Sequence, residues 1–244
     1  MRPFTERWPA LRSGPAVLGL ALAIVLSAPP VGADTSPGKN TSTEKAATGA
    51  AAGEAVKKQI QGLPPAEQVT RLRDLLERSP GDAHLSFYLG NAYLALELPD
   101  SAAAAYERAV AADSTYTKAY VNLGIALEDL RRFDDARLRY ENALAIDSTD
   151  VLAHCHLGHY FHTRGDLEQA VGHYARAIDI NPRSAQAHYN LGLAFADTRL
   201  FAEAIREWET VIDLSPESEL GRTAAENLRL IKTYVGKDSP RESK

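Results

Sequence analysis

Residues 122–125, Asn-Leu-Gly-Ile, contain the dipeptide that decides the fold, because Leu-Gly returns along the chain at a constant spacing. The pair at 123–124 has counterparts at 89–90, 157–158 and 191–192, each 34 residues from the next. Four other kinds of residue keep the same phase: an alanine at 102, 136, 170 and 204; an aromatic at Tyr106, Tyr140, Tyr174 and Trp208; a small residue at Ala109, Ala143, Ala177 and Val211; and a helix stop at Ser114, Ser148, Pro182 and Pro216. Several classes of residue in register over four copies indicate an internal repeat.

Each repeat has the pattern of two helices. Apolar residues fall at helical spacing after the Leu-Gly pair, as in Ala126, Leu127 and Leu130. The glycine and the alanine opposite it allow the two helices to approach closely, and we expect the aromatic residue to fill the gap between one hairpin and the next. A single hairpin cannot bury both of its apolar faces, so neighbouring hairpins must stack. The sequence therefore predicts an all-α fold of stacked helical hairpins.

The period and these positions resemble the tetratricopeptide repeat (TPR) family over about residues 83–216. The resemblance implies a right-handed solenoid of antiparallel helical hairpins. Its four full repeats are expected at 83–116, 117–150, 151–184 and 185–218. The aromatic residue that the family usually has three positions before Leu-Gly is here Ser86, Tyr120, His154 and His188. Pro99 opens a second helix, where its missing N–H is not needed.

Further helices are expected on both sides of the repeats. Residues 65–78 form an amphipathic pattern in phase with a second helix, so 56–82 is predicted to be a partial repeat. After the fourth repeat, Leu220, Ala224 and Leu228 share one helical stripe, which predicts a capping helix at 219–236. Residues 237–244 are predicted to be a charged tail.

The N-terminus has the three-part pattern of an export signal. Arg2, Arg7 and Arg12 precede a short apolar run at 16–26, and small residues lead to Ala33. We therefore expect 1–33 to be a signal peptide, which places the protein in a periplasm or outside the cell. The alternative is an uncleaved signal that anchors the chain in an inner membrane. Residues 34–55 lack aromatic and branched aliphatic residues, which predicts a flexible linker.

Composition excludes several classes of protein. The formal net charge of -5 disfavours a general nucleic-acid binder. Cys155 is the single cysteine of the chain, so neither an internal disulfide nor a thiolate zinc cluster is expected. No phosphate-binding loop, nucleotide-binding fingerprint or nucleophile motif is present, and no enzyme activity or cofactor is predicted.

The family resemblance implies a concave groove, lined by the first helix of each hairpin, that binds a peptide or protein segment. Asparagine amides in such a groove can both donate to and accept from a peptide backbone. The groove residues that the resemblance implies are Phe87, Asn91, Lys118, Asn122, Ile125, His156, His159, Tyr189, Asn190 and Leu193. Asn91 and Asn122 match two positions of the family's carboxylate clamp, but Phe87, Leu152 and His156 stand where its basic residues would be.

A histidine cluster in the third repeat supports a second hypothesis. Cys155, His156, His159 and His162 lie at spacings that share a helix face, and imidazole or thiolate suits Zn²⁺, Cu or Ni²⁺. These histidines can equally be packing residues and polar groove contacts, and His154 is expected to be half-buried. The sequence thus predicts an exported adaptor that binds another protein or peptide. The alternatives are a protein that handles a metal or haem, and a self-associating spacer.

Overall fold

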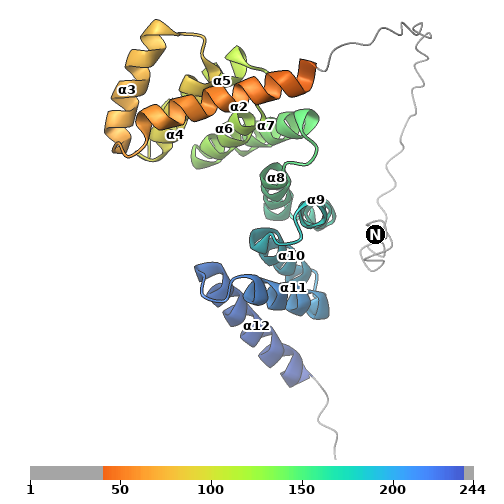
Figure 1. The fold of residues 1–244 in the computed structure, drawn as a ribbon. Helices are drawn as coiled ribbons and strands as arrows, with labels where there is room; N and C mark the ends of the chain where they lie inside the picture. The colour runs from red at the N-terminus through yellow and green to blue at the C-terminus, as the bar shows by residue number, and fades with distance from the viewer. Residues whose placement is uncertain (1–40, 239–244) are drawn as a thin grey trace, which may run out of the picture. The chain divides into compact units, whose positions relative to one another are not determined.

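The computed structural model describes residues 41–238, with side chains over 51–235. The predicted signal peptide at 1–33 lies outside the described residues, as do residues 34–40 and 239–244. Every regular element between 41 and 238 is an α-helix (Figure 1). The helices are α2 (Thr41–Ile60), α3 (Pro65–Arg78), α4 (Ala83–Leu94), α5 (Pro99–Ala112), α6 (Thr117–Asp129), α7 (Phe133–Ile146), α8 (Val151–Thr163), α9 (Leu167–Ile180), α10 (Ala185–Asp197), α11 (Phe201–Leu214) and α12 (Glu219–Asp238).

The chain divides into two units between Gln59 and Ile60, and α2 belongs almost wholly to the first. The prediction of a flexible linker at 34–55 was wrong from Thr41 onward, because α2 begins there. Six of the twenty residues of α2 are alanine, the strongest helix former, so the helix needs little burial to be favoured. No helix of the described residues combines the length and apolarity that a membrane span requires.

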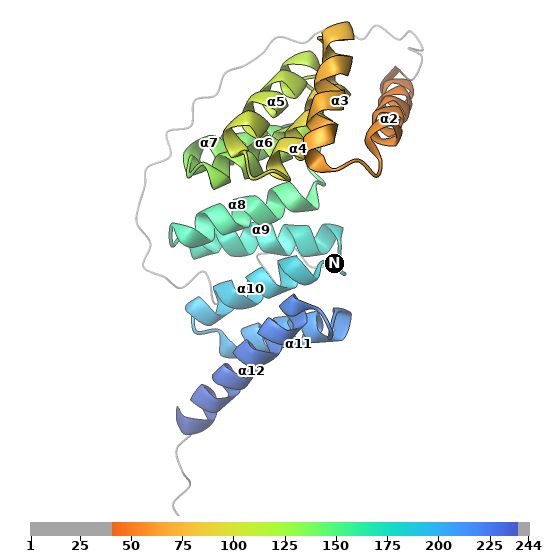
Figure 2. The same cartoon turned by 90° about the vertical axis from the view of Figure 1, so that its left-hand side faces the viewer.

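The second unit consists of helical hairpins in register with the sequence repeat. First helices begin at 83, 117, 151 and 185, and second helices begin at 99, 133, 167 and 201. Helix α3 spans the predicted range 65–78, and so begins 34 residues before α5. Each second helix packs on its own first helix and on the first helix of the next hairpin, and α12 packs on α11 (Figures 1 and 2). The structure therefore confirms an all-α stack of hairpins.

The glycine of each Leu-Gly pair lies against the aromatic ring of its own hairpin. A Cβ atom added at Gly90, Gly124, Gly158 or Gly192 would come within 2.4–2.5 Å of the ring of Tyr106, Tyr140, Tyr174 or Trp208. The expected packing between hairpins is seen at Tyr140, whose ring stacks on His156 of the next hairpin. Each of the four rings also occupies the space that the missing glycine side chain leaves within its own hairpin, and three of the four are fully buried.

The turn inside each hairpin reverses the chain through one residue with a left-handed backbone. These residues are Glu97, Arg131, Gly165 and Arg199, with φ between 57° and 79°. Only glycine adopts this conformation without steric cost, so three hairpins use a strained residue at this position. At the far end of the first two hairpins, the residue that follows the second helix stabilises the next turn. The carboxylates of Asp113 and Asp147 each accept hydrogen bonds from a threonine two residues later.

Candidate functional site

The residues before and after each Leu-Gly pair form a row of part-exposed side chains along the first helices. We call this set the ladder row: Tyr88, Asn91, Asn122, Ile125, His156, His159, Asn190 and Leu193. Each of them is half-buried or exposed, although the leucine and glycine between them are buried in every repeat. The fold therefore leaves one surface of every first helix only partly covered.

Between the first and second hairpins, the ladder row is fixed by an amide–hydroxyl junction. The Tyr106 hydroxyl donates to Asn91 Oδ1 at 2.7 Å, and Asn122 Nδ2 donates to the same oxygen at 3.0 Å. Burial raises the pKa of Tyr106, so its hydroxyl remains a donor. Asn91 and Asn122, predicted from different repeats, are thus brought together.

Between the second and third hairpins, His156 replaces the asparagine. Its ring stacks on Tyr140 with centroids 4.8 Å apart, and its Nδ1 lies 3.1 Å from Glu128 Oε2. Ile125 is half-buried against the hydrophobic core. This junction therefore presents an imidazole–carboxylate pair where the preceding junction presents amides.

The third and fourth hairpins are joined by His162, whose Nε2 lies 2.7 Å from Asp197 Oδ2. Asn190 Oδ1 accepts from Gln186 one turn earlier at 3.0 Å, and His159 is exposed. At the last junction, Asn227 of α12 donates to the Tyr189 hydroxyl at 3.3 Å. Polar side chains therefore bridge each junction between hairpins and the junction with α12, although those at the last two junctions lie outside the ladder row.

Three predicted groove residues lie outside the ladder row: Phe87, Lys118 and the half-buried Tyr189. Phe87 is only 8% exposed, with its ring against those of Tyr88, Tyr106 and Tyr116, so it is a core residue with almost no surface to offer a partner. Lys118 is exposed near the start of α6. The prediction failed at Phe87 because the first repeat has Ser86 at the aromatic position, so Phe87 supplies the apolar bulk to the core.

The four candidate metal ligands do not converge. Cys155 is buried, and burial raises the pKa of its thiol to about 11, so it is a poor source of thiolate. His156 and His162 face carboxylates on two different helices. Within the part of the chain that the structure describes, no three His, Cys, Asp or Glu side chains gather as metal ligands would. The metal hypothesis therefore gains no support from the geometry.

Two histidines at the usual aromatic position form contacts that the sequence did not predict. His154 Nδ1 lies 3.1 Å from His173 Nδ1, and His188 Nδ1 lies 2.6 Å from Glu207 Oε2. His173 and Glu207 are 34 residues apart, as are His154 and His188. The repeat register could have predicted that the two pairs correspond, because it places them at equivalent positions of adjacent hairpins.

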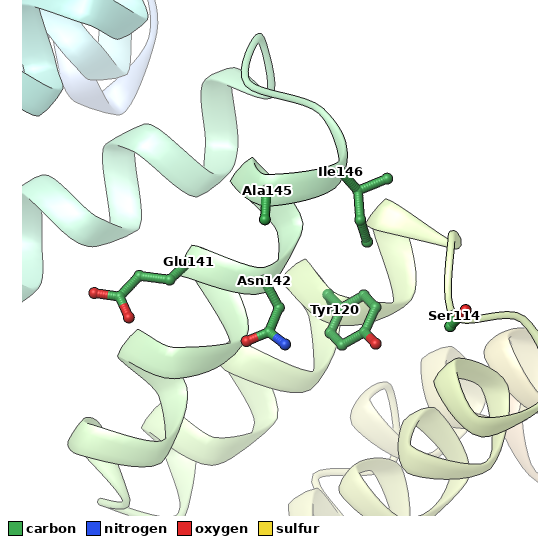
Figure 3. A pocket seen from close by; sticks show the side chains of 6 residues that line it. All are labelled: Ser114, Tyr120, Glu141, Asn142, Ala145 and Ile146. Atoms are coloured by element: carbon green, nitrogen blue, oxygen red, sulfur yellow. The ribbon is translucent and has the colours of Figure 1, made fainter. Parts of the chain in front are cut away.

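Two small hollows lie at related positions in the second and third hairpins. The first, of about 380 Å³, is lined by Ser114, Tyr120, Glu141, Asn142, Ala145 and Ile146 (Figure 3). The second, of about 290 Å³, is lined by His154, Gln169, Gly172, His173 and Arg176. Tyr120 corresponds to His154 and Asn142 to Arg176, so the two hollows overlap in part when the repeats are compared.

Tyr106 and Tyr174 provide a test of the junctions, because their hydroxyls differ in partners. Among the described side chains, the buried Tyr174 hydroxyl has no hydrogen-bond partner, whereas that of Tyr106 donates to Asn91. We expect Tyr106→Phe to lower the free energy of unfolding by about 1 kcal/mol, and Tyr174→Phe to leave it unchanged or raise it by up to about 1 kcal/mol. Urea denaturation of the two variants checks this. Equal losses in both would show that Tyr174 has a partner in solution.

Comparisons with known proteins agree with this architecture. Sequence models described as "Tetratricopeptide repeat" match residues 69–117 and 119–152, and one described as "TPR repeat" matches residues 158–198. No curated protein matches the chain.

Similar solved structures include MamA, with 23% identity and a TM-score of 0.56, over 61% of this chain and 87% of that one. MamA from Desulfovibrio magneticus RS-1, residues 41 to the end, is 17% identical with a TM-score of 0.60, over 70% of this chain and 97% of that one. YrrB, described as a TPR protein with an unusual peptide-binding site, is 22% identical with a TM-score of 0.54, over 71% of this chain and 99% of that one. At these identities the likeness establishes the fold. With the repeat period and the three sequence matches, it shows that the chain belongs to the tetratricopeptide repeat family.

Proposed function

We propose that the protein is a non-enzymatic adaptor that binds a segment of another protein along the ladder row. The observation that carries this proposal is the regular partial exposure of that row, since the same two positions remain only partly covered in all four hairpins. A fold that needed these residues only for packing would bury them as it buries the leucine and glycine between them. The similarity to YrrB, which is described as a TPR protein with an unusual peptide-binding site, supports the same class of function.

The chemistry of the row suits an extended backbone. Asn122 and Asn190 present amides, which both donate and accept, and they stand two repeats apart in the second and fourth hairpins. His159 is exposed between them. Binding would combine hydrogen bonds to the partner's main chain with apolar contact at Ile125 and Leu193, and would make or break no covalent bond.

The place of action that we propose is outside the cytoplasm, in the assembly of envelope or secreted complexes. The basic, apolar and small-residue segments of 1–33 support this location. The partner would then be another exported protein. Self-association through the same row is a second form that such a scaffold can take.

A photo-crosslinking experiment tests the proposal. A photoreactive amino acid at His159 is expected to capture one defined partner in cells, whereas the same group at Glu168, exposed on the second helix α9, is expected to capture none. Asn190→Ala should then lower the affinity for the purified partner by about fivefold to tenfold, because the hydrogen bonds of one amide contribute about 1 kcal/mol.

Asn190 suits this purpose because its side chain is hydrogen-bonded to the exposed Gln186, so its removal should spare the fold. The matched control is Gln186→Ala, which removes the other half of that bond. Equal capture at both photoreactive positions, or undiminished affinity of Asn190→Ala, would contradict binding along the row.

A further inference from the structure

The histidine pair of the third hairpin has a geometry that fixes where its protons lie. His154 Nε2 is 3.2 Å from the carbonyl oxygen of Ser148, which only accepts, so Nε2 carries a hydrogen. His154 Nδ1 faces His173 Nδ1 at 3.1 Å. If His154 is neutral, its Nδ1 is the acceptor and His173 must donate from Nδ1. The pair therefore needs one proton, and only one, between the two Nδ1 atoms.

The two rings meet head-on. Their centroids are 5.4 Å apart, which nearly equals the Nδ1–Nδ1 distance plus the short distance, about 1.1 Å, from each ring centre to its nitrogen. The lone pairs thus point along one line, as in a hydrogen bond. A shared metal ion would need about 2.0 Å to each nitrogen and would lie off that line. The geometry favours the hydrogen bond over a metal site.

The surroundings keep the pair uncharged. Burial lowers the pKa of both histidines; for His154 the nearby Arg176 adds to this effect, while the Ser148 carbonyl and Asp150 oppose it. Burial and His154 lower the pKa of His173 to about 4. Phe161 stacks on His173, and Gln169 and Gly172 line the same hollow. On the helices packed against α8 and α9, the groups at equivalent repeat positions are Arg139 on α7 and His188 on α10. Glu207 is the counterpart of His173 on α11, which packs on α10.

The fourth hairpin has the same arrangement with a carboxylate. His188 Nε2 lies 3.1 Å from the carbonyl oxygen of Pro182, the counterpart of Ser148, and its Nδ1 faces Glu207. When both nitrogens of His188 carry a hydrogen, each can donate a hydrogen bond, because both partners are acceptors. Adding protons therefore suits the fourth hairpin and disturbs the third.

We propose that the His154–His173 pair is an acid-sensitive latch that closes the third hairpin at neutral pH and loosens it on acidification. When both rings are protonated, two N–H groups point at each other and the bond is lost. The sign follows from linkage: folding lowers both pKa values, so the unfolded chain takes up protons first, and stability is lost as pH falls from about 6.5 towards about 4. The latch acts on α8, which carries His156 and His159, but does not depend on partner binding.

Histidine-labelled NMR of the full chain tests the proton positions. At pH 7.5 we expect His154 with hydrogen on Nε2 and His173 with hydrogen on Nδ1. Hydrogen exchange then tests the latch: between pH 7.5 and 5.0, after correction for the intrinsic exchange rate, amides of α8 and α9 should lose about tenfold more protection than those of α10 and α11.

Two variants separate the latch from other histidines of α8. His173→Gln keeps an uncharged donor toward His154 Nδ1 and should abolish the excess loss of protection, although His156 and His162 are still present in this variant. His173→Glu copies the fourth hairpin and should make the third hairpin gain protection at pH 5.0 relative to its own value at pH 7.5. Hydrogen on His173 Nε2 at neutral pH, equal responses of the two hairpins, or a full response retained in His173→Gln would each overturn the proposal.

Discussion

Gly158→Ala is expected to lower the free energy of unfolding by about 3 kcal/mol, because the site has no room for a methyl group. The added Cβ would lie 2.5 Å from Cε1 of Tyr174, with two further ring atoms within 2.9 Å. The ring is fully buried and cannot swing aside, so α8 and α9 must separate. Overpacking of this kind costs about 1–3 kcal/mol or more, which outweighs the gain of about 1 kcal/mol in helix propensity.

Gly172→Ala in the same hairpin is the matched control. Gly172 lies inside α9, and nothing lies within 4 Å of the position of its Cβ. The helix propensity then acts alone and should raise the free energy of unfolding by about 0.5–1 kcal/mol. Urea denaturation of both variants should therefore give shifts of opposite sign. A loss of similar size in both would mean that glycine acts here through backbone freedom and not through the space beside Tyr174.

Much of the fold could be predicted because the same residue pattern occurs in each repeat. The Leu-Gly pair, the alanine and the aromatic residue fix both helices of a hairpin, and α3 was found at its predicted range because it keeps the same phase. The error at α2 had a different cause. Residues 34–55 have little apolar area to bury, but alanine favours a helix through its backbone without burial.

For the candidate site, the sequence predicted which residues share a surface but not which hydrogen bonds they form. Repeat register placed Asn91 and Asn122 in one row, but only the structure shows that Asn91 Oδ1 accepts from both Asn122 and the Tyr106 hydroxyl. The left-handed turn residue at Arg131 left no signal, because three of the four turns use a residue other than glycine. Phe87 was assigned by analogy with the family, and the small Ser86 beside it reverses which of the two positions carries the bulk.

Glu207→Ala is the second substitution with a large expected effect, a loss of about 2–3 kcal/mol. The carboxylate lies 2.6 Å from His188 Nδ1, and the side chains of the two residues are 10% and 19% exposed for His188 and Glu207. Breaking such a buried pair leaves a charged or strongly polar ring without its carboxylate in a poorly hydrated place. Glu207→Gln keeps an acceptor for the Nδ1 hydrogen, so it should lose only about 1 kcal/mol.

Glu209→Ala on the same helix provides the control for this prediction. Glu209 accepts from Lys232 at 2.9 Å, but both side chains are about half exposed, and pairs of this kind contribute less than about 1 kcal/mol. Chemical denaturation at pH 7 should therefore rank the losses as Glu207→Ala, then Glu207→Gln, then Glu209→Ala. If Glu207→Ala cost no more than Glu209→Ala, the His188 ring would draw its support from the Pro182 carbonyl and its packing. The carboxylate of the fourth hairpin would then contribute no measurable stability, and the proposed contrast with the histidine pair of the third hairpin would not hold.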